Sequence, residues 1–334
     1  MSIVVVKAGI ADSIQDLGRY GYQHQGINPT GVMDDIAARL ANILVGNNFS
    51  EAVIELHFPC SSFLFTQDAL CAITGANYTA LINEQEIENN KPFITRKGDV
   101  LKFVKLISGA RCYLAIRNGL AIAKWLNSNS TNTMAGFGGN NQGKFFQKND
   151  EIQFNTTAAY SKALKTDNDR MLSWKIYEKK LYTTNNNIRI IAGNEYNALN
   201  SESKKIFEKT SFIIATQSNR MAYRMNGTEL HLHKNHSLIS SAVTKGTIQL
   251  LPNGQIIVLM ADHQTTGGYP RIGHVISADI ATLAQCKPNE KIQFNIITQE
   301  AAERELLYQN QLLTEMKEAN NLQLNNWLIT FNIQ

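Results

Sequence analysis

A dense run of polar residues and glycines directly follows an apolar stretch at residues 256–260. The run reads Asp262-His263-Gln264-Thr265-Thr266-Gly267-Gly268-Tyr269-Pro270. Gln and Thr side chains offer donors and acceptors that suit an amide, a urea-like group or a carboxylate. Paired glycines allow the backbone to approach a ligand closely or to adopt a positive φ. The run therefore predicts a site for a small polar molecule, the alternative being a polar turn that satisfies its own backbone groups.

Chemical roles can be assigned within this run. Asp262 could accept a proton or orient Gln264, so we expect it to be a catalytic residue. The residues that we expect to bind substrate are Gln264, Thr265, Thr266, Gly267, Gly268 and Tyr269.

A second segment that is rich in polar residues and glycine covers residues 13–21 and 31–34. Asp16 and Asp34 are its candidate catalytic carboxylates. Arg19 would bind a substrate carboxylate or phosphate through two parallel hydrogen bonds. The alternative is a local ion pair between Asp16 and Arg19, and exposed pairs contribute only ~0–1 kcal/mol.

Arg220 could extend such an anion site, unless it is a strand residue that faces water. Together these expectations place residues 15–34 and 262–270 at one cleft between the two halves of the chain. The proposed occupant of that cleft is a compact polar molecule.

Several other motifs lack the residues that their chemistry requires. No Gly-Lys-Ser/Thr follows the glycines at 136–139, which excludes a P-loop. His231, His233 and His236 have no Cys or carboxylate that would complete a ligand set, so we expect no metal site. The chain also has no Gly-x-Ser-x-Gly motif of a serine hydrolase and no segment for covalent attachment of biotin.

The composition indicates a globular protein of about two domains. The 334 residues are 43% hydrophobic and 18% charged, and 32 Lys and Arg against 28 Asp and Glu give a net charge of +4. We found no cluster that concentrates the positive excess, so we expect neither a nucleic-acid partner nor a membrane partner. The apolar stretches are too short to cross a bilayer or to act as a signal sequence. The four cysteines are far apart in sequence, which predicts buried reduced thiols and a cytoplasmic protein.

Short apolar stretches bounded by turn residues predict a mainly β protein with few helices. The expected strands are Ile3–Val6, Ser62–Thr66, Leu70–Thr74, Val100–Lys105, Arg111–Ile116, Ile188–Ala192, Ser211–Ala215, Thr247–Leu251 and Ile256–Met260. The expected helices are Asp34–Val45, Ser277–Gln285 and Gln299–Ala319. We expect the first of these to begin at its two aspartates and to end at Gly46.

A short pattern occurs three times, at residues 98–103, 149–154 and 289–294. Each copy has a turn residue, an acidic residue and an alternating strand that ends in Phe. The pattern is compatible with two tandem β-barrels, although many β proteins reuse such hairpin entries. We therefore expect an N-terminal barrel at 1–160, a polar connector at 161–187, a C-terminal barrel at 188–298, and a helical tail with a final strand at 299–334.

The sequence resembles the allophanate hydrolase subunit 2 family, also called the biotin-dependent carboxyltransferase-like family. The resemblance covers about residues 3 to 305. The matching segments are Ser13–Gly21, Gly31–Asp34, Ala41–Asn47, Ile54–Leu56, Ile73–Ala76, Gly98-Asp99, Arg111–Ala115, Ser128–Thr131, Lys245–Gln249, Asp262–Pro270 and Ala278–Gln285. The Gln-Asp-Leu-Gly-Arg and Gln-Thr-Thr-Gly-Gly-Tyr-Pro runs carry most of its specificity.

This resemblance implies two cyclophilin-like β-barrel domains and a role in a multi-subunit enzyme. The family includes the C subunit of 5-oxoprolinase, a complex that opens 5-oxo-L-proline to L-glutamate with ATP. The implied partners are a subunit 1 homologue that resembles the B subunit of 5-oxoprolinase and a lactam-utilisation protein that resembles its A subunit. The implied substrate is a small amide or lactam, and the implied activity requires these partners.

Two other functions remain open at this point. The chain could be the carboxyltransferase component of a urea carboxylase, in which case carboxybiotin would arrive on a separate carrier. It could instead be a regulatory protein that binds a kinase-inhibitor-like subunit 1 partner without turning over substrate.

Overall fold

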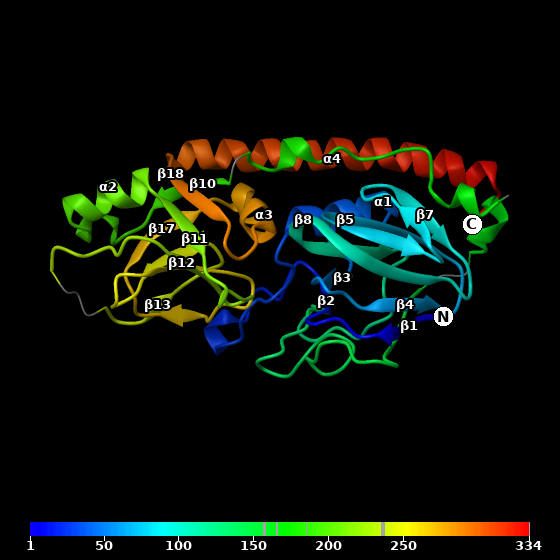
Figure 1. Cartoon of the computed structure of the whole chain (residues 1–334), viewed down its shortest axis with the longest axis horizontal. Coiled ribbons are helices and arrows are strands. Elements are labelled where there is room, and N and C mark those ends of the chain that lie inside the picture. Colours follow the sequence, from blue (N-terminus) through cyan, green and yellow to red (C-terminus); the bar gives the residue numbers. More distant parts are fainter. Residues whose placement is uncertain (156–157, 165, 185, 235–237, 334) are drawn as a thin grey trace. The chain divides into compact units, whose positions relative to one another are not determined.

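The computed structural model describes residues 1–155, 158–164, 166–184, 186–234 and 238–333 (Figure 1). Two compact units are present, and both are discontinuous in sequence. Unit 1 comprises residues 1–18, 34–178 and 312–334, and unit 2 comprises residues 19–33 and 179–311. Both units are built mainly from β-strands, which confirms the predicted fold class.

Unit 1 is a curled antiparallel sheet. Its strands are β1 (Ser2–Lys7), β2 (Ser13–Gln15), β3 (Val53–Leu56), β4 (Ser62–Phe65), β5 (Ala69–Ile82), β6 (Gln85–Ile87), β7 (Pro92–Thr95), β8 (Val100–Ile116) and β9 (Glu151–Gln153). They are ordered β2-β3-β8-β4-β1-β9, and β5 pairs with β6, β7 and β8. Strands β5 and β8 pair along most of their length, with register shifts between Gly75 and Ala80 of β5, and side chains of both enter the core, among them Ile73, Tyr78 and Leu114.

Helix α1 (Asp35–Leu44) packs on this sheet as the sequence predicts. Asp34 caps it, since Asp34 Oδ1 accepts a hydrogen bond of 2.8 Å from the Ala37 N–H. Gly46 follows the helix with a φ of 74°, a conformation that glycine adopts without strain. Thr74 Oγ1 of β5 donates to Ala37 O over 2.6 Å and so ties the sheet to the helix.

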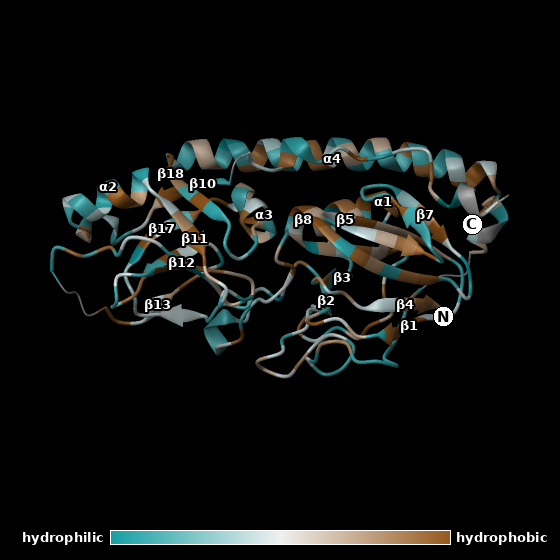
Figure 2. Cartoon of the chain, viewed as in Figure 1, coloured by the Kyte–Doolittle hydropathy of each residue, from teal (hydrophilic) through white to brown (hydrophobic). Residues whose placement is uncertain are grey.

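Unit 2 is a closed barrel with the strand order β10-β17-β14-β15-β12-β11-β18. The barrel strands are β10 (Asn187–Ala192), β11 (Ser211–Ile214), β12 (Ala222–Asn226), β14 (Thr247–Leu250), β15 (Ile256–Leu259), β17 (Arg271–Val275) and β18 (Lys291–Ile296). Strands β10 and β18 pair in parallel, and the other neighbouring pairs are antiparallel. Figure 2 shows apolar residues along these strands, and the rings of Phe207, Phe212 and Phe294 pack together in the core.

The shorter elements of unit 2 surround this barrel. They are α2 (Ser201–Lys209), α3 (Ser277–Gln285), and a two-stranded ladder of β13 (Ser241–Ala242) and β16 (Thr266–Gly267). Helix α3 agrees with the predicted range, and the Arg189 guanidinium holds it to β10 through Asp279.

The repeated sequence pattern corresponds to one recurring turn. Asp99, Asp150 and Glu290 each accept a hydrogen bond from the backbone N–H three residues earlier, over 2.7, 2.8 and 3.1 Å. The preceding residues Gly98, Asn149 and Asn289 have φ values of 92°, 73° and 71°. Gly and Asn tolerate this left-handed conformation, so the pattern marks the start of β8, β9 and β18.

Residues 161–187, expected to be a connector, include short 3-10 turns. The turns η2 (Tyr160–Ala163) and η3 (Asp167–Arg170) belong to unit 1, and η4 (Lys179–Leu181) belongs to unit 2, as do η1 (Gln23–Gln25) and η5 (Tyr196–Ala198). Arg170 forms a buried ion pair with Asp99, which fixes this stretch to the sheet of unit 1. Positions 165 and 185 of the expected connector lie outside the described residues.

The C-terminal segment corrects one prediction. Helix α4 (Gln299–Thr330) continues through residues 325–330, where we expected a final strand. Leu313, Asn320 and Leu324 are buried at helical spacing, so one face of the extended helix is covered. Residues up to 311 belong to unit 2 and those from 312 onward to unit 1.

The last features to compare with the sequence are the cysteines and the character of the helices. All four cysteines are buried and unpaired, as expected. Within the part of the chain that the structure covers, no helix has the length and apolar character needed to cross a membrane.

We predict that Asn320→Ala destabilises unit 1. Asn320 is buried; its Nδ2 donates to Ile43 O over 2.6 Å, and its Oδ1 accepts from Trp174 Nε1 over 2.8 Å. The substitution leaves both groups without this partner, so the free energy of unfolding should fall by about 1–3 kcal/mol. Urea denaturation measures the effect, with the exposed Asn325→Ala on the same helix as control. Equal stability of the two variants would contradict the prediction.

Candidate functional site

An ion pair fixes the start of the polar run in unit 2. Arg220 Nε and Nη2 donate to Asp262 Oδ2 and Oδ1 over 2.8 and 3.0 Å. Both side chains are nearly buried, with 10% and 6% of their surfaces exposed. Arg220 Nη2 also donates to Gly31 O over 2.6 Å, and the Asp262 N–H donates to Arg220 O over 2.8 Å. The guanidinium therefore joins the 262–270 run to the loop that contains Gly31.

The loop of residues 19–33 meets the polar run within unit 2. Asn28 Nδ2 donates to Asp262 O over 3.2 Å, and Lys245 Nζ donates to the carbonyls of Val32 and Met33 over 2.9 and 2.8 Å.

Arg19 is completely buried, and its Nη1 donates to Thr30 Oγ1 over 3.1 Å. The structure thus brings Arg19, Arg220 and Asp262 into one unit, where Arg19 binds a side chain of the loop and Arg220 links the loop to Asp262.

The middle of the polar run forms strand β16. Thr266 and Gly267 pair with Ala242 and Ser241 of β13, and the Val243 N–H donates to Thr265 O over 3.1 Å. These bonds satisfy the backbone, so the Gln264, Thr265 and Thr266 side chains are not needed for that purpose. Gln264 and Thr265 are half-buried and Thr266 is exposed.

Beneath this run lies a polar group of side chains on the barrel. Ile248 and Leu250 of β14 point into the apolar core, so the alternate residues Thr247 and Gln249 face the opposite side of the strand. We call the polar residues gathered there the outer-barrel cluster; its members are Lys245, Thr247, Gln249, His263, Gln264 and His274.

Gln249 is the most unusual member of the outer-barrel cluster. It is fully buried, yet its Nε2 has no hydrogen-bond partner among the residues that the structure describes. Its Oε1 lies 3.5 Å from Gln264 Nε2. A Cβ on Gly267 would come within 2.5 Å of Gln249 Nε2, so any other residue at this position would require the end of the Gln249 side chain to move. Gln249 Nε2 is therefore a buried donor, under a loop that contains glycine, for which the described residues supply no acceptor.

Two histidines of the cluster have lowered pKa values, which favours their neutral form. Burial lowers the pKa of His263 below its usual value, and the nearby positive charge of Lys245 lowers it further. Burial also lowers the pKa of His274, whose Nδ1 lies 3.5 Å from Thr247 Oγ1. His263 Nδ1 lies 2.5 Å from Gln264 O and must carry the proton, because a carbonyl oxygen only accepts. Nε2 of neutral His263 is then available to act as a base.

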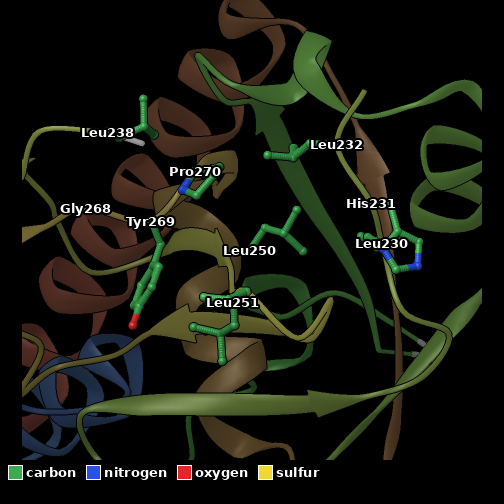
Figure 3. Close-up of a pocket in the computed structure, with 10 residues that line it drawn as sticks. Leu230, His231, Leu232, Leu238, Leu250, Leu251, Gly268, Tyr269 and Pro270 are labelled. Carbon is green, nitrogen blue, oxygen red and sulfur yellow. The ribbon is translucent and has the colours of Figure 1, made fainter. Parts of the chain in front are cut away.

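The end of the run lines an adjacent groove of about 450 Å³. Figure 3 shows Gly268, Tyr269 and Pro270 on one side, Leu250 and Leu251 in the middle, and Leu230, His231 and Leu232 on the other side. Tyr269 is 43% exposed. The polar run therefore has two faces: Gln264 and Gly267 contact Gln249, whereas Gly268 and Tyr269 border the groove.

The carboxylates of Asp16 and Asp34 belong to unit 1 and are bound by their own surroundings. Asp16 Oδ1 accepts from the hydroxyls of Ser128 and Ser130 over 2.7 and 2.5 Å, and its Oδ2 accepts from the Asn129 N–H over 2.6 Å. Asp34 is fully buried as the N-cap of α1, and its N–H donates to Tyr113 Oη over 2.9 Å. Each carboxylate organises the backbone around it.

Four residues of the outer-barrel cluster were not among the predicted site residues: Lys245, Gln249, His263 and His274. Lys245 and Gln249 lie in a segment that carried the family resemblance, and His263 lies within the polar run itself, so these three had a usable signal. His274 had none, because its place opposite Thr247 depends on strand register. Among the described residues there is no group of three or more His, Cys, Asp or Glu side chains that could hold a metal, and His236 lies outside them.

Comparison with known proteins adds an independent observation. Residues 25–296 match the family model described as carboxyltransferase domain, subdomain A and B. The chain is 34% identical to the 5-oxoprolinase C subunit of Haemophilus influenzae over 87% of its own length and 90% of that protein. It is 32% identical to the 5-oxoprolinase C subunit of Escherichia coli over 87% and 89% of the two chains. The crystal structure of the K. lactis urea amidolyase has the same fold, with a TM-score of 0.83 and 24% identity over 94% of this chain and 20% of that one.

We predict that Gly267→Ala disturbs the outer-barrel cluster. The added methyl group would lie 2.5 Å from Gln249 Nε2, and the resulting overpacking should cost about 1–3 kcal/mol of stability. Gln249→Ser in the same chain removes the clashing amide and should restore part of the loss. Thermal unfolding of both variants measures this, with Thr266→Ala as the control. A Gly267→Ala protein as stable as the wild type would contradict the close contact.

We also predict that the histidines make unit 2 less stable in acid. A lowered pKa in the folded state means that the unfolded chain binds more protons between that pKa and about 6.5, so stability rises with pH in this range. The stabilisation is complete above about pH 6.5 and is lost as the pH falls through the folded-state pKa values. The double variant His263→Asn, His274→Asn should lose part of this dependence in urea denaturation between about pH 7.5 and pH 5. An unchanged pH dependence would show that neither histidine titrates abnormally.

Proposed function

Because the chain belongs to the family of carboxyltransferase domains with subdomains A and B, we propose that it acts as the C subunit of a 5-oxoprolinase. This hydrolase complex would open 5-oxo-L-proline to L-glutamate with the use of ATP. The observation that carries the proposal is the similarity to the 5-oxoprolinase C subunits, which extends over nearly the full length of both chains. The similarity to urea amidolyase supports the fold but covers only a small part of that larger protein.

The outer-barrel cluster is the proposed substrate site. A lactam offers one N–H and one carbonyl oxygen, and the carboxamides of Gln249 and Gln264 carry the complementary acceptor and donor. Thr265, Thr266, Gly267, Gly268 and Tyr269 border the same loop and are the further proposed binding residues. Neutral His263 would accept a proton during ring opening, a role that requires a pKa below the working pH.

The charged residues that we expected in the site are proposed to act as positioning residues. Arg220 and Asp262 hold the start of the polar run, and Arg19 holds the loop beside it. Asp16 and Asp34 hold a loop and a helix of unit 1. Buried charges with several hydrogen bonds are costly to disturb, which favours a fixed structural role for these side chains.

Partner proteins complete the proposed enzyme. We propose that two further subunits, one like the A subunit and one like the B subunit of 5-oxoprolinase, join this chain. ATP would be used by the whole complex, which we place in the cytoplasm. Carboxybiotin on a separate carrier would be needed only if the chain transferred a carboxyl group to urea. The proposed site uses no metal.

The test is ATP-dependent release of glutamate from 5-oxoproline by the purified three-subunit complex. Gln249→Ala and Gln264→Ala should each lower kcat/KM by about 10-fold or more, since each removes a hydrogen bond of about 1.5 kcal/mol to a reacting amide. Gln323→Ala, on the exposed surface of α4, is the control and should leave activity unchanged.

Other outcomes separate the alternatives. Urea- and bicarbonate-dependent ATP turnover that avidin blocks would replace the proposal with a urea carboxylase component. Tight binding to the B-like partner without turnover of any substrate would indicate a regulatory protein.

A further inference from the structure

The connection between β8 and β9 contains an exposed, firmly built loop that the proposed substrate site does not use. We propose that this loop, residues 124–144 of unit 1, docks a partner protein of the same complex by presenting apolar side chains and two lysines to an acidic surface of that partner. The inference rests on the proposed function in so far as the partner belongs to that complex. In Figure 1 the connection is the green segment that runs beside β1 and β2.

The loop displays apolar side chains on a fixed frame. Met134 at its tip is 67% exposed and Trp125 is 39% exposed. The Trp125 ring packs against Phe137 with a centroid separation of 4.2 Å. Asn132 Oδ1 accepts from the N–H groups of Met134 and Ala135, each over 3.0 Å, which shapes the tip. The exposed apolar groups are thus held in one arrangement rather than on a free segment.

The backbone of the loop includes several left-handed conformations. Leu126 has a φ of 49°, which is uncommon for a residue with a branched side chain. Gly139 and Gly143 have positive φ values, and a Cβ on Gly143 would lie 2.3 Å from the backbone nitrogen of Phe137. Strained backbone of this kind persists only where the surroundings enforce it, and it concentrates at functional positions.

Asp16 supplies that enforcement at the base of the loop. Its carboxylate accepts hydrogen bonds from Ser128, Asn129 and Ser130, all buried. Thr131 Oγ1 donates to Ile14 O over 2.9 Å. The base is therefore buried in unit 1, whereas Lys124, Trp125, the tip at residues 133–136 and Lys144 are exposed.

The charge of this region indicates the chemistry of the partner. Residues 100–149 contain no Asp or Glu and seven Lys or Arg, which corrects the expectation that no segment concentrates the positive charge. Lys124 and Lys144 flank the exposed apolar groups, and neither forms an ion pair within the described part of the chain. Asp150, at the end of the connection, is engaged by the Gln147 N–H. An acidic partner surface would find two available ammonium groups here.

Exposed apolar side chains beside lysines on a fixed loop favour a protein partner. Met and Trp are common at the centres of protein interfaces, and a ring of charge around them sets orientation and association rate. A firmly shaped loop avoids the entropy that a flexible segment loses on binding.

The experiment measures the affinity of the full chain for the purified A-like and B-like proteins of the same organism by biolayer interferometry. Lys124→Glu with Lys144→Glu, and separately Met134→Glu, should each weaken binding to one of these proteins at least 10-fold. The control Lys209→Glu with Lys291→Glu makes the same charge change on exposed residues of unit 2 and should alter affinity less than twofold. Higher salt should weaken the wild-type interaction and affect the Lys124, Lys144 variant less. Unchanged thermal unfolding shows that the variants are folded.

The outcomes for docking and for the proposed function are distinguishable. If the complex forms and releases glutamate while the loop variants bind like the wild type, the docking proposal is wrong and the function stands. If the loop variants lose affinity but the complex releases no glutamate, the docking proposal stands and the function fails. If neither protein binds the wild-type chain, or if the charge reversal weakens only binding to RNA or to anionic vesicles, the docking proposal is also wrong.

Discussion

The ion pair between Arg220 and Asp262 is the constraint on which the geometry of unit 2 depends most. Two of the guanidinium nitrogens meet the two carboxylate oxygens, and a further hydrogen bond reaches the carbonyl of Gly31. Removal of one partner from such a buried pair typically costs about 3–5 kcal/mol, because the remaining charge is left uncompensated. The pair fixes the direction in which the chain leaves β15, and the position of Gln264 and Gly267 over Gln249 follows from that direction.

Unit 1 uses a carboxylate in the same way. Asp16 gathers Ser128, Asn129 and Ser130, which lie more than 110 residues further along the chain. A carboxylate that accepts several N–H and O–H groups can bend the backbone around a point without a regular ladder. This arrangement explains how a long connection between β8 and β9 keeps a defined shape while forming few strand pairs.

The sequence predicted the secondary structure well, but it did not predict which side chains bind segments that are distant along the chain. Alternating apolar residues located the strands, and Asp34 and Gly46 marked the two ends of α1, because these signals act within a few residues. The final strand was wrong because residues 325–331 are apolar enough for either structure, and the burial of Leu324 in helical register decides between them. The partners of Asp16 and Arg220 could not be read from the sequence, since they depend on how distant segments meet in the fold.

The fold also determines which of the polar residues are still available to bind a ligand. Carboxylates and arginines are prominent candidates in a sequence because they can do acid–base chemistry or bind anions, but Asp16, Asp34, Asp262, Arg19 and Arg220 all have hydrogen-bonding or ionic partners within their own units. The groups that remain in the outer-barrel cluster are carboxamides, hydroxyls and histidines whose pKa values are lowered, together with Lys245. Gln249 has a buried donor without a described acceptor, and Gly267 lies directly against its amide group. A site of this composition discriminates by hydrogen-bond pattern more than by charge, and an amide or lactam presents the donor and acceptor that such a pattern requires.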